Sequence, residues 1–276
     1  MIKYFNHRLH RLSVVLQGCS HNSCKLCKLW VLLVALLSAG CDSGDIEEKT
    51  YAVSDTGYVV KLTVRISGTE ALDRKYTLAL AGFVSGDNYA KVQQSLPTDI
   101  GEGETVSLVM SNVSEQVSTV EFVVTNRRRE RIVTLRSISL ADYDVNAKDT
   151  IRLDLGTVDL SPFGCLQQGV FNVACIQCHG GNGRSAASLN LTAGQALSQL
   201  VDVPSTRKEG MFRVVSGDAQ QSLLHQILAE GGEEILHYNH TEVASSQFKD
   251  NLSALRSFID DWINGLAPPA VSIFVP

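Results

Sequence analysis

The chain has 276 residues, of which 44% are hydrophobic and 19% are charged. This balance is typical of a folded globular protein and excludes an intrinsically disordered one. The formal net charge is −5, and because an acidic surface does not attract nucleic acid, we expect no nucleic-acid partner.

The first 41 residues have the layout of an export signal. They contain no Asp or Glu, and five basic residues precede the uncharged run LWVLLVALLSAG. That run is shorter than the roughly 20 apolar residues that a transmembrane helix needs. Without the five cations, 19 basic residues stand against 29 acidic ones, so the exported chain has a net charge near −10. Cys19, Cys24 and Cys27 belong to this leader, and we expect them to be removed with it.

The leader ends in LLSAGC, which resembles the lipobox of bacterial lipoproteins. A lipobox usually has a larger apolar residue at the position of Ser38, whereas the small residues before Cys41 match it. The resemblance implies that residues 1–41 are a signal peptide and that Cys41 is the lipidated first residue of the mature chain. The alternatives are an ordinary cleavage site and an uncleaved signal anchor. We therefore expect a protein anchored by lipid to a membrane of the cell envelope, facing the periplasm or the cell exterior.

Residues 51–160, which follow a linker at 42–50, alternate between apolar and polar positions as half-buried strands do. Val60, Leu62 and Val64 share one face of such a strand. Four further segments alternate in the same way, centred on Leu78, Leu108, Phe122 and Leu153. Turn-forming residues separate the segments, and the pattern predicts an all-β, Ig-like antiparallel sandwich. This region has no His and no Cys, and a spacer, a docking module and a sugar binder all remain open for it.

Residues 161–268, followed by a C-terminal tail at 269–276, change to a helical period. Ser161 and Pro162 are typical of a helix N-cap and first turn. A last helix is predicted to begin near Ser246 and to end at Gly265. We therefore predict a small all-α domain after the sandwich, with the stretch VACIQCHGGNG near its first helix.

That stretch contains the motif C-x-x-C-H, formed by Cys175, Cys178 and His179. Three chemistries use this spacing: a redox dithiol, part of a zinc site and covalent haem attachment. A redox dithiol normally follows a strand and opens a helix, whereas this motif follows a helix. A zinc site needs a fourth ligand, which Cys165 or a histidine at 237–240 would supply. Haem fits best, because two thiols form thioethers with its vinyl groups and the adjacent imidazole reaches the iron.

Residues 161–267 resemble the bacterial class I cytochrome c domain. They contain a first helix, the motif CIQCH, the element RVVSGDAQQSLL and a terminal helix ending in FIDDWINGLAP, over about two fifths of the chain. The resemblance implies one covalent haem c, with Cys175 and Cys178 as the thioether residues and His179 as the proximal iron ligand.

The sequence also predicts the surroundings of two more residues, Cys165 and Arg213. Cys165 is predicted to be a buried, inert thiol. Arg213 opens the RVVSGD element; it is a candidate partner for a haem propionate, although we expect a solvent-exposed arginine there.

The sixth iron ligand is where the chain departs from the family that it resembles. Related domains often use a methionine after the middle element, but no methionine follows Met211, which we expect to fill core space. His225 lies within a predicted helix, whereas His237 and His240 lie in ILHYNHTEV, where the family places its distal ligand. We predict His237 as the distal ligand and His240 as the alternative. A histidine in place of a methionine predicts a lower reduction potential.

These features predict a membrane-anchored c-type cytochrome that transfers single electrons between redox partner proteins of the cell envelope. We expect an electron carrier rather than an enzyme, and we predict no catalytic residue. Two alternatives remain open. One is a haem-containing sensor or peroxidase-like enzyme with an open distal site; the other is a binding protein whose β-sandwich takes a glycan or a protein and whose haem is an accessory.

Overall fold

The computed structural model describes residues 57–68, 72–144, 150–248 and 251–267. Cys41, the predicted lipidation site, lies outside these residues, as do the rest of the leader and the C-terminal tail. The chain divides into two compact units, and all the described residues belong to the second, Val53–Pro276. Within the described ranges, no helix combines the length and the apolar character needed to cross a membrane.

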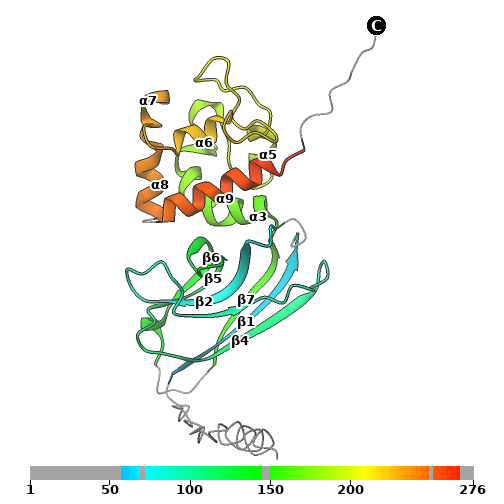
Figure 1. Cartoon of the computed structure of the whole chain (residues 1–276), viewed down its shortest axis with the longest axis vertical. Coiled ribbons are helices and arrows are strands. Elements are labelled where there is room, and N and C mark those ends of the chain that lie inside the picture. The colour runs from blue at the N-terminus through cyan, green and yellow to red at the C-terminus, as the bar shows by residue number, and fades with distance from the viewer. Residues whose placement is uncertain (1–56, 69–71, 145–149, 249–250, 268–276) are drawn as a thin grey trace, which may run out of the picture. The chain divides into compact units, whose positions relative to one another are not determined.

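Two β-sheets make up the first part of this unit, called here the β region (residues 57–160; Figure 1). The first sheet has the strand order β4-β1-β7: β1 (Tyr58–Ser67), β4 (Thr105–Val113) and β7 (Thr150–Asp159). The second has the order β3-β2-β5-β6: β2 (Tyr76–Phe83), β3 (Val92–Ser95), β5 (Thr119–Asn126) and β6 (Arg131–Ser139). Strands therefore occur at every alternating segment of the sequence. All neighbouring strands are antiparallel except β1 and β7, which run parallel.

The two sheets differ in how their strands are buried. In β1 the side chains of Val60, Leu62 and Val64 are fully buried and the residues between them are not, so only one face is covered. In β5 every residue from Val120 to Thr125 is buried, which requires both faces of the second sheet to be covered.

The continuous burial of β5 includes a charge, the carboxylate of Glu121. Arg131 donates to both of its oxygens, from Nε at 2.9 Å and from Nη2 at 2.8 Å. The hydroxyls of Thr134 and Thr119 donate to it at 2.7 and 2.9 Å. The guanidinium of Arg131 also lies over the ring of Phe83, 3.9 Å from its centroid. The buried carboxylate is thus surrounded by donors, which offsets the cost of removing it from water.

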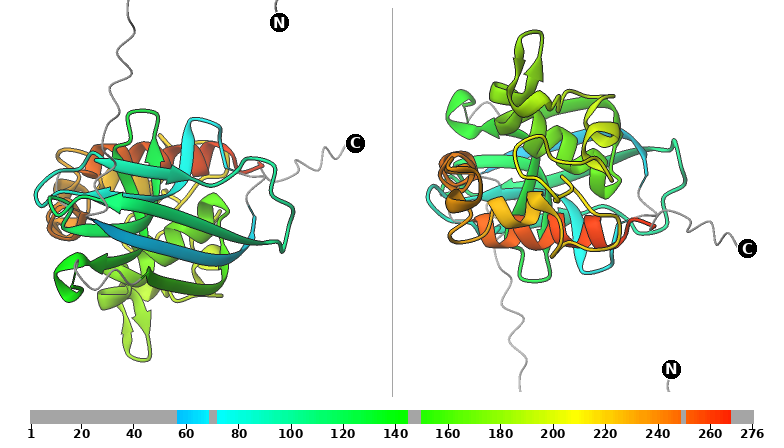
Figure 2. Two further views of the ribbon diagram at one scale, coloured as in Figure 1. Left: turned by 90° about the horizontal axis from the view of Figure 1, so that it is seen from below. Right: turned by 90° about the horizontal axis from the view of Figure 1, so that it is seen from above.

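The second part, called here the C-terminal region (residues 161–267), consists of short helical segments, a small hairpin and extended connections. The segments up to the hairpin are α3 (Pro162–Leu166), the π-helical η4 (Gln167–Cys175), α4 (Ile176–His179), β8 (Gly180–Gly181) and β9 (Arg184–Ser185). The later ones are η5 (Ala186–Ser188), α5 (Ala196–Leu200), α6 (Leu223–Ile227), α7 (Glu233–Leu236), α8 (His240–Phe248) and α9 (Leu252–Asn264). Figure 2 shows the β8–β9 hairpin projecting from this region.

The sequence located the start of this region and the end of its last helix correctly, since Gly265 is the C-cap of α9, but not the start of that helix. Ser161 caps α3 as predicted, since its Oγ accepts a hydrogen bond from the backbone N–H of Gly164 at 3.0 Å. The single last helix expected from Ser246 onward is instead two helices, α8 and α9.

The predicted fold class, an all-β sandwich followed by an all-α domain, is wrong. The structure is mixed α and β, with two β-sheets and few helices, and its C-terminal region is not all-α. The β8–β9 hairpin and isolated bridges such as Val201–Val214 and Pro204–Phe212 lie between the helices. Gly217, with a φ of +79°, lies in the turn between Val215 and Asp218, and His237, with a φ of +56°, ends α7. The parallel β1–β7 pair also departs from the expected antiparallel pattern.

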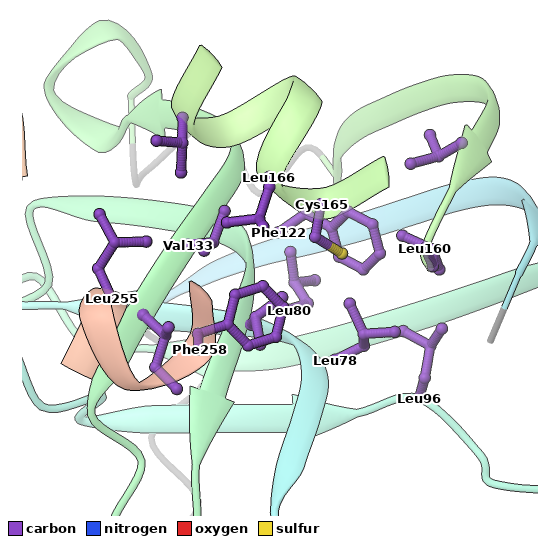
Figure 3. Close-up of a cluster of buried hydrophobic side chains, with 14 of the residues drawn as sticks. Leu78, Leu80, Leu96, Phe122, Val133, Leu160, Cys165, Leu166, Leu255 and Phe258 are labelled. Atoms are coloured by element: carbon purple, nitrogen blue, oxygen red, sulfur yellow. The ribbon is translucent and has the colours of Figure 1, made fainter. Parts of the chain in front are cut away.

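The C-terminal region and the β region share one hydrophobic core. α3, η4 and α9 contact β6, and α3 also contacts β7. Figure 3 shows part of this core, in which Leu80 and Phe122 of the second sheet lie among Cys165, Leu166 and Phe258 of the helices. The helices are therefore placed by packing against the sheets as well as by their own periodicity.

η4 lies close against β6 at Gly169. A Cβ atom at this position would lie 2.3 Å from Cγ1 of Val133 in β6. At the other end of the interface, the Tyr76 hydroxyl donates to Asp261 of α9, and Lys75 forms a 2.6 Å salt bridge with the same carboxylate. η4 and α9 are thus fixed on β6, and α4, which carries the C-x-x-C-H motif, continues directly from η4.

Candidate functional site

The two motif cysteines face a common cavity. Cys175 ends η4 and Cys178 lies in α4, three residues further on, a spacing that places both side chains on one face of a helix. Both thiols are free, and both line the cavity. Burial, and then the neighbouring Cys178, raises the pKa of the Cys175 thiol to about 12, so the thiol stays protonated at neutral pH.

The imidazole of His179, the last residue of α4, is held in one orientation. Its Nδ1 lies 2.9 Å from the carbonyl oxygen of Ala186. Because a carbonyl oxygen only accepts hydrogen bonds, Nδ1 carries the proton and Nε2 keeps its lone pair. Burial lowers the pKa of His179 from its ordinary value, which favours the neutral ring. A neutral histidine with Nδ1–H bonded to a backbone carbonyl has the arrangement that metal-ligating histidines have in proteins.

The cavity beside the motif has a volume of about 370 Å³. This lies within the range of roughly 300 to 1,000 Å³ that is usual for ligand pockets. Its walls come from η4, α5, α6, α8 and α9 and from the segment after α4, and they are mainly apolar. Residues that line it include Phe171, Leu189, Leu200, Leu223, Ile227 and Ile259.

One buried cation lines the same cavity. Arg213 is only 8% exposed, so the expectation of a solvent-exposed arginine is wrong. Its guanidinium donates to the carbonyl oxygen of Gln199 at 2.8 Å and to those of Ala187 and Ser188 at 3.2 Å. Carbonyl groups satisfy its N–H donors but carry no opposite charge, and no salt bridge found among the described residues includes it. The charge of Arg213 is therefore available to an anionic group in the cavity.

The two candidate distal histidines lie in different surroundings. His240, the first residue of α8, lines the cavity, and its Nδ1 is buried with no hydrogen-bond partner. Burial lowers its pKa; the backbone of Tyr238 opposes this shift, and the charge of His179, which lines the same cavity, adds to it. His237 is exposed, ends α7 with a φ of +56°, and is not part of the cavity wall.

The other two candidates for the sixth ligand are also away from the cavity wall. His225 is buried, but its Nδ1 lies 2.7 Å from the carboxylate of Asp260, which already occupies that nitrogen. Met211 is partly exposed, and the wall contains no methionine among the described residues.

The donor set around the cavity fits a covalently attached haem. It offers two thiols on one face, a neutral imidazole with a defined free nitrogen, a second imidazole with an unsatisfied buried nitrogen, apolar walls and the buried cation of Arg213. The zinc alternative has less support. No group of three His, Cys, Asp or Glu side chains suited to a metal ion occurs in the described part of the chain, and Cys165 is buried in the shared core.

No protein-family model, curated protein or solved structure matches the chain. The function is therefore inferred from the motif and the geometry of this cavity.

Proposed function

We propose that the chain is a c-type cytochrome, with one haem c attached covalently at Cys175 and Cys178, and that it transfers single electrons. The observation that supports this most is the convergence of the two thiols and His179 on one apolar cavity, with Nδ1 of His179 bonded to the Ala186 carbonyl. Two thiols and an imidazole with a free nitrogen are the donors that a haem c needs.

Each part of the cavity has a defined task in this proposal. Cys175 and Cys178 bind the cofactor through thioethers, and His179 offers Nε2 to the iron while Ala186 keeps the ring from rotating. The apolar walls exclude water, which limits the reorganisation of solvent when the charge changes. Arg213 places a positive charge where a propionate carboxylate would be accepted. When bound, the haem supplies the reversible one-electron couple.

We also propose that the protein works outside the cytoplasm, anchored to a membrane through Cys41, with redox proteins of the cell envelope as donor and acceptor. The support is the basic leader with its uncharged apolar run and its LLSAGC end, together with the need for haem c to be attached after export. Labelled fatty acid should enter the wild-type protein and not the Cys41→Ser variant.

Covalent haem is tested directly by denaturing gel electrophoresis and a haem peroxidase stain. The full chain, produced in cells competent in cytochrome c maturation, should give a stained band at its own mass. The double variant Cys175→Ala/Cys178→Ala should be unstained, and Cys165→Ala, which removes a cysteine outside the cavity wall, should stain like the wild type. An unstained wild-type band would overturn the proposal.

A further inference from the structure

His240 presents a buried nitrogen without a partner at the cavity. Its Nδ1 is one of only four buried side-chain polar atoms without a hydrogen bond among the described residues. Buried polar atoms in native proteins are nearly always paired, so each exception calls for an explanation. Among these four residues, only His240 lines the cavity that contains the C-x-x-C-H motif.

The backbone of His240 is fixed from both sides. The side chain of Asn239 caps α8, since its Oδ1 accepts a hydrogen bond from the N–H of Glu242 at 2.8 Å. The hydroxyl of Thr241 lies 3.3 Å from the carbonyl oxygens of Ile227 and Ala229, at the C-terminal end of α6. Ile227 itself lines the cavity. His240 is therefore positioned by a capped helix start that is tied to another wall of the same cavity.

We infer that His240 is the sixth ligand of the haem iron, opposite His179. This inference rests on the proposed function, because it requires a haem at Cys175 and Cys178. His240 lines the cavity, whereas the exposed His237, the Asp260-bound His225 and Met211 do not. Ligation by His240 would also account for a histidine in the cavity wall whose buried Nδ1 has no hydrogen-bond partner.

Two imidazole ligands define the behaviour of the site. With His179 and His240 both holding the iron, no coordination site would be open to a peroxide or a gas, which favours a carrier over a haem sensor. A second histidine also omits the thioether ligand that raises the potential of other cytochromes c. The couple therefore lies at lower potential than in a His/Met site, which suits an acceptor or donor of correspondingly low potential.

The experiment compares two variants of the full chain, matured with haem: His240→Ala and, as the matched control, His237→Ala. The wild type and the control should show six-coordinate low-spin ferric spectra, and their ferrous forms should not bind carbon monoxide readily. His240→Ala should become high-spin, and its ferrous form should bind carbon monoxide. Added imidazole should restore the low-spin spectrum of His240→Ala by occupying the space left by the ring.

The outcomes separate this inference from the proposed function. A haem-stained wild type in which His237→Ala becomes high-spin, or in which His240→Ala stays low-spin, would overturn the assignment of His240 and leave the cytochrome intact. An unstained wild type would overturn the cytochrome itself. If His240→Ala does not mature, His240→Met serves instead, because it keeps a ligand at the same place. It should show the far-red charge-transfer band of an iron–thioether bond and a raised reduction potential, and an unchanged spectrum and potential would refute the assignment.

Discussion

The β region and the C-terminal region differ in whether their buried polar groups have hydrogen-bond partners. In the β region the buried carboxylate of Glu121 is surrounded by donors from its own sheet. In the C-terminal region four buried polar atoms have no partner, and among the described residues such atoms occur only there: Gln167 Oε1, His240 Nδ1, Asn251 Oδ1 and Arg256 Nε. The buried carboxylate of the β region thus has its donors within that region, whereas the C-terminal region leaves buried atoms unpaired, one of them on His240, which lines the cavity of the proposed haem.

The two regions also differ in the lengths of their elements. The β region has strands of up to ten residues, whereas most helices of the C-terminal region have four or five residues. Such helices are not stable alone and depend on packing. A ligand that binds only the folded state stabilises that state. The stability of the C-terminal region should therefore depend on the proposed haem far more than that of the β region does.

The largest expected effect follows from preventing attachment of the proposed haem. In Cys175→Ala/Cys178→Ala, amide hydrogen exchange should accelerate strongly in residues 161–267, while β1, β2 and β5 keep their protection, because no residue of these strands lines the cavity. Cys165→Ala, which leaves the motif intact, is the control. Equal loss of protection in both regions would show that they form one cooperative unit through their shared core, and the comparison above would fail.

A second test removes the hydrogen-bond network around Glu121 from the β region. Glu121→Ala leaves Arg131 as a buried charge without its carboxylate, and breaking a buried pair costs about 3 to 5 kcal/mol of unfolding free energy. Arg128→Ala is the control, because the side chain of Arg128 is 74% exposed and its pair with Glu130 should contribute less than about 1 kcal/mol. Urea denaturation gives both values. Similar losses in the two variants would mean that the β region does not rely on this network.

The smallest effect concerns Cys165, at the boundary of the two regions. Burial raises the pKa of its thiol to about 12 from an ordinary value near 9, with a further contribution from Asp159. The unfolded chain ionises first, so this residue's contribution is complete below about pH 9 and is lost as the pH rises towards about 12. The stability of the wild type should therefore fall more steeply over that range than that of Cys165→Ala. Parallel curves from pH 9 upward, or rapid alkylation of Cys165 in the folded protein, would contradict its burial.

The sequence predicted the local parts of the fold. Alternation located β1, β2, β4, β5 and β7, and Ser161 located the first helix. The partners of each strand were not predictable in this way. β1 and β7 alternate like any other strands, and nothing in their pattern shows that they pair with each other in parallel. The division of the helical stretches into short segments was also missed, because apolar spacing continues across turns such as the one at His237, where left-handed backbone ends α7.

The candidate site likewise has a part that the sequence predicted and a part that it could not predict. C-x-x-C-H is contained in five consecutive residues, so its thiols and imidazole were recognisable in the sequence. The choice between His237 and His240 depends on where α7 ends and α8 begins, since three residues separate an exposed ring from one in the cavity wall. The burial of Arg213 depends on carbonyl groups from two other segments, Gln199 and the pair Ala187 and Ser188. No local pattern around Arg213 contains that information.

The parallel pairing of β1 and β7 has a mechanical consequence. β1 begins at Tyr58 and pairs with β7 from Val59–Thr150 to Ser67–Asp159, so the chain enters at one end of this ladder and leaves at the other. In a chain tethered through Cys41, a pull on the C-terminal region would load the two strands from opposite ends. The force would shear many hydrogen bonds together instead of opening them one by one. The β region would then act as a strong link between the anchor and the electron-transfer site, and single-molecule stretching from the two ends would measure its strength.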